Sequence, residues 1–199
     1  MKKVLIVCSI AVCLCIFLAF IFWFIVSGAF VMLVPSPAKP KIADSEFPFI
    51  LTYEIDGNTT TIEDVAIVEF DGYGEKTSAG QSRKWTVYTK GNSSSNSKEE
   101  KNNSLDIVIL DVTANNEYDK FGNKILELYF YGGNGHYFMS DKLGWLDRDA
   151  QEIDCVNYMC ETVNGELRYK SMDAEEAFEK FKIRLISWEC APPIENEFR

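Results

Sequence analysis

His136 is the only histidine in this 199-residue chain, so any site that needs a histidine base must use this residue. A serine or cysteine nucleophile requires such a base within hydrogen-bond distance, and a third group that orients the base. His136 follows the glycine-rich segment 132–135, and aromatic residues stand on both sides of it. This setting favours a surface or half-buried turn histidine over a catalytic one.

One enzymatic alternative uses the cysteines located after His136. His136, Cys160 and Arg168 occur in the order of a sortase-like cysteine transpeptidase, a family that the chain also resembles in joining an apolar N-terminal segment to a β-rich region. The resemblance implies Cys160 as the nucleophile, His136 as its acid–base partner and Arg168 as the cation. Cys155 as nucleophile and Arg184 as cation fit the same order. The residues before Cys160 are not the threonine–leucine–x–threonine sequence of sortases, so an exported cysteine enzyme is our second hypothesis.

The segment 124–139 gathers aromatic residues around its glycines. Strand alternation predicts that Leu126, Leu128 and Phe130 face a core. Ile125 and Glu127 then lie on the opposite face, together with two tyrosines. Two interpretations fit that face equally: a stacking surface for a sugar or a peptide, and packing beneath the helix that carries Phe178 and Phe181. The predicted ligand-binding residues are Tyr129, Tyr131, His136 and Tyr137.

Acidic residues raise the question of a metal site. Asp147, Asp149 and Gln151 alternate as in a calcium loop, but an EF-hand requires a glycine at its sixth position and a bidentate glutamate at its twelfth. Those positions hold Glu152 and Tyr158. One histidine and scattered cysteines support a zinc site no better. We therefore predict neither a metal site nor a cofactor.

Apolar residues alternate through most of the chain after residue 46, which predicts strands. The predicted strands cover 47–55, 62–70, 84–89, 105–112, 124–131, 137–139, 153–162, 167–169 and 183–189. One amphipathic helix is predicted at 173–181, where Asp173 and Glu176 form a capping box and Phe178 and Phe181 share a face. This order of elements predicts an α+β fold, in which a mostly antiparallel sheet is covered by one C-terminal helix.

The N-terminal run 4–34 contains no charged residue and exceeds the roughly 20 apolar residues that a transmembrane helix needs. Lys2 and Lys3 precede it and predict a cytoplasmic N-terminus, with export of the chain beyond the helix. A cleaved signal peptide is the alternative. The predicted parts are a cytoplasmic tip at 1–3, a transmembrane helix at 4–34, a stalk at 35–46 and an extracytoplasmic β-rich domain at 47–199. Within that domain, a disordered polar loop is predicted at 91–104.

The chain carries 30 acidic against 20 basic side chains, and this net charge of −10 disfavours binding to nucleic acid. Five segments resemble a group of uncharacterised small membrane-anchored proteins of Gram-positive bacteria, namely 46–55, 69–74, 83–85, 127–139 and 175–194. The resemblance implies a cell-surface location and brings no activity or site residue. We expect a domain tethered to the cell membrane by one helix and facing outward. Its expected role is that of a non-enzymatic binding or accessory module for a protein or envelope partner.

Overall fold

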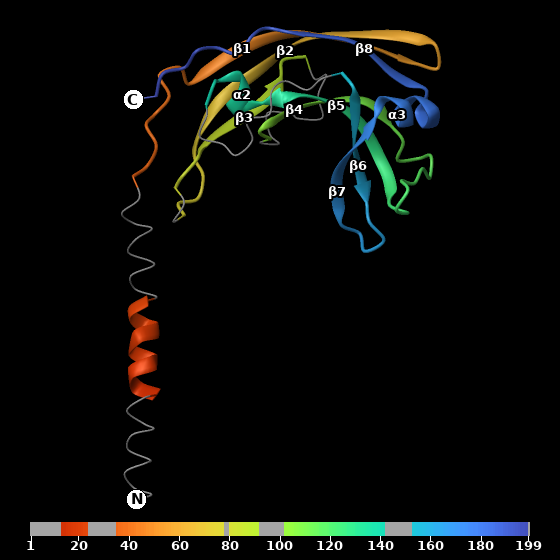
Figure 1. Ribbon diagram of the computed structural model, residues 1–199. Coiled ribbons are helices and arrows are strands. Elements are labelled where there is room, and N and C mark those ends of the chain that lie inside the picture. The colour runs from red at the N-terminus through yellow and green to blue at the C-terminus, as the bar shows by residue number, and fades with distance from the viewer. Residues whose placement is uncertain (1–12, 24–34, 78–79, 92–101, 142–152, 199) are drawn as a thin grey trace, which may run out of the picture. The chain divides into compact units, whose positions relative to one another are not determined.

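The computed structural model describes residues 13–23, 35–77, 80–91, 102–141 and 153–198 (Figure 1). Most of the described chain after residue 43 is organised in two four-stranded antiparallel sheets, with only short helices beside them. The prediction of an α+β fold with one sheet under a helix is therefore wrong. The predicted C-terminal helix exists, but with eight residues it is too short to form a layer of its own.

The predicted transmembrane helix is also corrected. Residues 13–23 are helical, and no helix in the described ranges is long and apolar enough to cross a membrane. The remainder of the predicted segment, 4–12 and 24–34, lies outside the described residues. So do most of the polar loop predicted at 91–104 and the acidic segment from Asp147 to Gln151.

Sheet 1 has the strand order β3-β2-β1-β8. Its strands are β1 (Asp44–Ile55), β2 (Asn58–Tyr73), β3 (Arg83–Thr89) and β8 (Ile183–Cys190). The β1–β2 hairpin turns at Asp56 and Gly57, whose φ angles of 50° and 80° are those of the tight turn that a strand pair of this twist prefers. The sequence Asp56-Gly57-Asn58 is typical of such a turn, because Gly and Asn adopt positive φ angles at little cost.

Sheet 2 has the strand order β4-β5-β6-β7. Its strands are β4 (Ser104–Asp111), β5 (Lys124–Asn134), β6 (Cys155–Glu161) and β7 (Leu167–Asp173). The strand predicted at 137–139 is wrong, because α2 (Gly135–Phe138) takes its place. The Asn134 side chain accepts a hydrogen bond of 2.9 Å from the backbone N–H of Tyr137, which caps this short helix.

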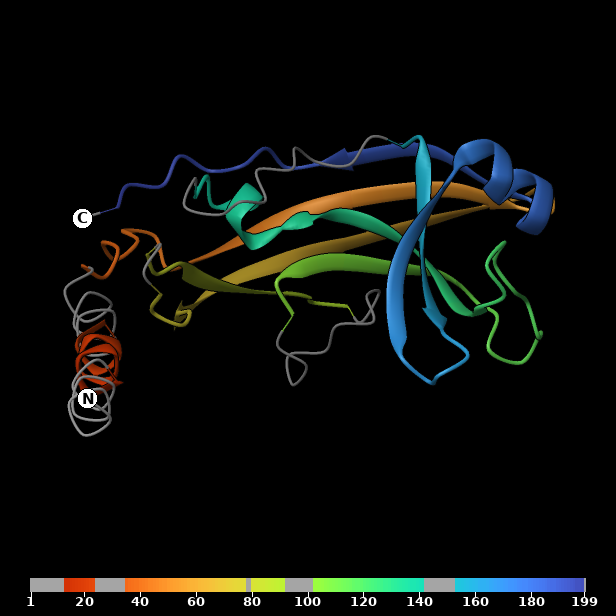
Figure 2. The same cartoon turned by 60° about the horizontal axis from the view of Figure 1, so that its bottom comes forward.

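The core lies between the two sheets, and aromatic rings connect them. Phe130 of β5 packs on Trp188 of β8 with ring centroids 4.8 Å apart, and Trp188 also contacts Phe49 of β1 at 5.3 Å. A Cβ atom at Gly132 would lie within 3.0 Å of the Trp188 ring, so a glycine is required there for the sheets to approach. Figure 1 shows β4 and β5 beneath β1 and β2, and Figure 2 shows β6 and β7 running steeply across the other strands.

A register shift in β5 changes the predicted faces of that strand. The pairing with β6 shifts between Ile125 and Glu127, so that two residues of β5 oppose one position of β6. Ile125 is therefore fully buried with Leu128 and Phe130, and Leu126 is only partly buried. The prediction placed Leu126 in the core and Ile125 opposite, which is wrong at those two positions and right from Leu128 onward.

Helix α3 (Ala174–Phe181) begins where the capping box predicted, because Asp173 accepts a hydrogen bond of 2.8 Å from the backbone N–H of Glu176. Lys182 ends the helix with a left-handed φ of 57°. Phe181 is buried, but Phe178 is 39% exposed. The apolar face predicted for this helix is thus only partly covered.

Two terminal segments of the fold pair with each other. The segment 35–46 was predicted as a stalk, but Ile42 exchanges hydrogen bonds with the Asn196 side chain, and the backbone N–H of Lys41 donates to Glu197 at 2.8 Å. Residues 1–38 and 73–83 form a separate compact unit. Within it, the Arg83 guanidinium donates a hydrogen bond of 3.0 Å to the Ala38 carbonyl.

Candidate functional site

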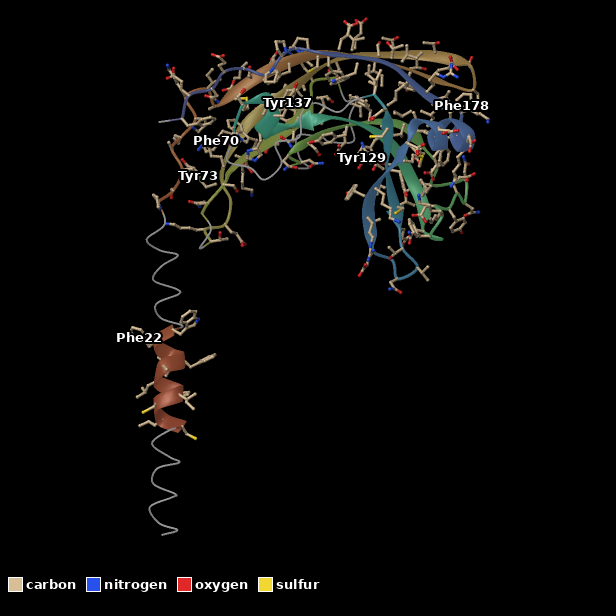
Figure 3. The ribbon with its side chains drawn as sticks, viewed as in Figure 1. Phe22, Phe70, Tyr73, Tyr129, Tyr137 and Phe178 are labelled. Atoms are coloured by element: carbon tan, nitrogen blue, oxygen red, sulfur yellow. The ribbon has the colours of Figure 1, made fainter. Side chains whose placement is uncertain are left out.

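The outer face of sheet 2, turned away from the core, carries three tyrosines from two strands. We call this surface the tyrosine face, and its residues are Asp106, Tyr129, Tyr131, Asn157 and Tyr169. Strand register places them together: Tyr129 is paired with Asn157, Tyr131 with Asp106, and Tyr169 with the residue two positions after Asn157. Figure 3 shows Tyr129 on β5 beside the β6–β7 pair.

Two of these rings form an edge-to-face pair across β6. The centroids of Tyr129 and Tyr169 are 6.4 Å apart and their planes meet at 79°. Tyr129 is 9% exposed, whereas Tyr169 is 68% exposed. The pair therefore presents one ring that is held in place by its surroundings and one that solvent, or a ligand, can reach from several sides.

Polar groups beside the rings are partly desolvated. Burial raises the pKa of the Asp106 carboxyl, and hydrogen bonds from Ser104 at 2.8 Å and Asn102 at 3.3 Å oppose this effect only in part. Burial, with Asp106 and the two neighbouring tyrosines, also raises the pKa of Tyr129 well above its usual value. The Tyr129 hydroxyl is therefore neutral at all physiological pH values. The face thus offers hydroxyl groups, an amide and a carboxylate next to flat apolar rings.

The other two residues predicted to bind a ligand, His136 and Tyr137, lie in α2 and not on the tyrosine face. Tyr137 packs against Phe138 with centroids 5.3 Å apart and contacts the core (Figure 3). The four predicted residues thus fall into two groups, and only Tyr129 and Tyr131 share a surface. Tyr169 and Asp106 belong with them, although neither was predicted.

His136 has one partner that the sequence did not suggest. Its Nδ1 atom lies 3.5 Å from Oδ2 of Asp141, and the same oxygen accepts a hydrogen bond of 2.9 Å from Nε1 of Trp85. Asp141 is buried, and its backbone N–H donates to the His136 carbonyl. Nδ1 of His136 is buried and has no hydrogen-bond partner among the described residues, so the pair lacks the bond that orients the histidine of a catalytic triad. A triad also needs a nucleophile at the far nitrogen.

The cysteine that the enzymatic alternative requires lies elsewhere. Cys160 is paired with Ile125, near the start of β5, while His136 follows the end of that strand. The nine residue steps from Ile125 to Asn134 span about 30 Å in an extended strand. Burial raises the pKa of the Cys160 thiol, opposite to the shift that activates a nucleophile. The structure pairs Cys160 with Arg168 but does not bring His136 to them.

A second buried carboxylate, Asp119, was also missed by sequence reasoning. One of its oxygens accepts hydrogen bonds from Lys170 at 2.5 Å and Asn123 at 2.9 Å, and the other accepts from two backbone N–H groups of its own loop. Burial alone would raise the pKa of Asp119, but these hydrogen bonds outweigh it and hold the pKa far below its usual range. Lys170 stands 51 residues away on β7, so no local pattern predicts the pair. This cluster holds the loop before β5 to the sheet.

Metal ligands do not gather in the part of the chain that the structure describes, where no group of three or more His, Cys, Asp or Glu residues could hold an ion. Within the same residues, the cysteines after residue 12 form no disulfide. Comparison with protein-family models, with curated proteins and with solved structures finds no match to this chain. The interpretation of the site therefore depends on its geometry and chemistry.

Proposed function

We propose that this protein is a binding module whose tyrosine face holds a neutral oligosaccharide. The observation that carries the proposal is the edge-to-face pair of Tyr129 and Tyr169 over β6, next to the partly desolvated carboxyl of Asp106. A sugar ring has apolar C–H faces that pack on aromatic rings, and hydroxyl groups that donate to a carboxylate or an amide. The tyrosine face provides both kinds of partner within one surface.

The charge of the molecule supports a neutral ligand over an anionic one. The chain has a net charge of −10, and the tyrosine face itself contains Asp106, with Glu127 two residues before Tyr129. A polyanion would be repelled by this field. Burial raises the pKa of Glu127, and the nearby charge of Asp111 adds to this shift.

The cysteine transpeptidase, our second hypothesis from the sequence, has no comparable support, because no arrangement of its three residues is complete. Cys160 pairs with Arg168, and Cys155 and Arg184 line one cleft, but His136 joins neither group. The location at the cell surface and the resemblance to anchored Gram-positive proteins stay predictions. An outward location would place the tyrosine face among the saccharides of a cell envelope, which is the class of ligand that the face favours.

Isothermal titration with chitohexaose and cellohexaose, two neutral oligosaccharides, tests this function. We expect at least one of them to bind, and we expect Tyr169→Ala to weaken that binding by about tenfold, or ~1.4 kcal/mol, through loss of ring contact. Tyr118→Ala is the matched control, because Tyr118 is also an exposed tyrosine but lies in the loop before β5. Absence of binding to both sugars, or equal loss with Tyr118→Ala, would contradict the proposal.

A further inference from the structure

A second candidate site, separate from the tyrosine face, lies between the start of β6, helix α3 and the start of β8. It is a cleft of about 260 Å³, and we call it the α3 cleft. Apolar side chains provide most of its lining, with a thiol and a guanidinium at its sides: Cys155, Val156, Phe178, Ile183, Arg184 and Leu185. Pockets for drug-sized ligands measure roughly 300–1,000 Å³, so this cleft has room for a smaller apolar body.

The exposed phenylalanine of the helix is a wall of this cleft and is bordered by two cations. The Arg184 guanidinium lies 4.8 Å from the centroid of the Phe178 ring, and the Lys182 ammonium lies 5.4 Å from it. Figure 3 shows Phe178 on α3, at the opposite end of the sheets from Tyr137. Arg184 is exposed, and its contact with Phe178 places the guanidinium beside the apolar lining of the cleft.

Arg184 makes no ion pair with any carboxylate of the residues that the structure describes, although the chain has ten more acidic than basic side chains. Glu54 is its register partner on β1, and Glu175 lines the same cleft, yet neither reaches it within 4.0 Å. An arginine is able to form two parallel hydrogen bonds with one carboxylate. Its capacity for such a bond is unused in the described part of this chain.

We propose that the α3 cleft binds a small amphiphilic carboxylate, with its short apolar chain against Phe178, Val156 and Leu185 and its carboxylate on Arg184. The apolar lining stabilises the chain by burial, at about 0.8 kcal/mol for each methylene group removed from water. Lys182 adds a second positive charge beside the Phe178 ring. Lys182 and Arg184 together outweigh the single negative charge of Glu175 on the lining. This inference goes beyond saccharide binding and does not depend on it.

Alkylation of Cys155 measures occupancy of the cleft directly. The probe is sodium octanoate, added to the full chain before brief treatment with iodoacetamide, and peptide mass spectrometry gives the extent of reaction at each cysteine. We expect octanoate to slow alkylation of Cys155 and to leave Cys190, a partly buried cysteine outside the cleft, unchanged. Equal protection of both cysteines, or of neither, would overturn the proposal.

The role of Arg184 is tested with matched head groups and matched variants. Octanol and octylamine carry the same chain as octanoate, and we expect both to protect Cys155 at much higher concentration only. Arg184→Gln should weaken the binding of octanoate by roughly tenfold. The control Arg168→Gln removes an exposed arginine paired with Glu166 and should leave octanoate binding unchanged. Equal protection by the three compounds would overturn the assignment of Arg184. If Arg184→Gln lowers the melting temperature, the test uses Arg184→Lys instead. This variant keeps the charge but loses the two parallel hydrogen bonds, so it should also weaken the binding of octanoate.

Discussion

The outer faces of the two sheets differ, although their inner faces meet in one core. On sheet 1, Ile50 of β1 stands between its register partners Glu63 and Glu189, and Tyr88 of β3 is buried with its hydroxyl donating to Glu69 at 2.6 Å. On sheet 2, the ring of Tyr169 is itself part of the exposed surface, beside the buried ring of Tyr129. The aromatic group on sheet 1 is already satisfied by its own neighbours, whereas Tyr169 on sheet 2 leaves most of its ring to solvent. Exposure and pairing, more than strand pattern, therefore distinguish a binding face from a structural one.

The largest effect is expected from the polar cluster around Asp119, which joins the loop before β5 to Lys170 on β7 of sheet 2. Asp119→Ala leaves Lys170 without its buried partner and should lower the free energy of unfolding by roughly 3–5 kcal/mol. On sheet 1, Glu46→Ala breaks an exposed ion pair with Lys90 and should cost at most about 1 kcal/mol. Urea unfolding of both variants measures the difference, and equal effects would contradict this distinction between the two sheets.

The contribution of Asp119 has a definite pH dependence. Because hydrogen bonds hold its folded pKa below the unfolded value of about 3.9, the stabilisation is complete above that pH and is lost as the pH falls below it. The parent protein and Asp119→Ala should therefore approach the same stability in acid. A difference that stays constant down to the acid-unfolding pH would show that the carboxylate charge is not what stabilises the loop.

Two phenylalanines of α3 separate core from surface at the edge of the sheets. Phe181→Ala removes a buried ring and should destabilise the domain by roughly 3 kcal/mol. Phe178 is partly exposed at the α3 cleft, so Phe178→Ala should cost about 1 kcal/mol. Thermal unfolding provides the comparison. If the two variants melt alike and well below the parent, Phe178 is part of the core and the cleft is not an open site.

A smaller effect of opposite sign is expected on the tyrosine face itself. Glu127 lies opposite Asp111, and burial together with this like charge raises its pKa. Glu127→Gln should therefore stabilise the protein by about 0.5 kcal/mol at pH 7, where the parent carboxylate is ionised. Since the folded pKa lies above the unfolded one, the gain should vanish below about pH 4, where both states bind the proton. Glu63 on sheet 1 pairs with Ile50 of β1, and no acidic register partner is found for it among the described residues, so Glu63→Gln should show no gain. A gain there, or none for Glu127→Gln, would contradict this interpretation.

Sequence reasoning succeeded where neighbouring residues decide the structure. The alternation from Phe47 to Tyr53 and the cap of α3 at Asp173 are local patterns, and the structure confirms both of them. It failed at Asn134, whose side chain caps a short helix where alternation predicted a strand.

The candidate site could be predicted only in part, for the same physical reason. Tyr129 and Tyr131 were found because they are two residues apart on one strand. Tyr169 joins them through the register of two further strands, and the partners of Asp141 and Asp119 include residues 56 and 51 positions away. Such pairings depend on how strands align in the folded sheet, which local spacing does not determine.

Mapping of bound saccharide by nuclear magnetic resonance tests the central claim most directly. An isotope-labelled sample is titrated with chitohexaose and, separately, cellohexaose, and the backbone amide shifts of the two outer faces are compared. We expect the largest changes at Tyr129, Asn157 and Tyr169, and none beyond error at Ile50, Glu63 and Glu189. Changes concentrated on sheet 1, or no changes with either sugar, would contradict the assignment of the tyrosine face as the binding surface.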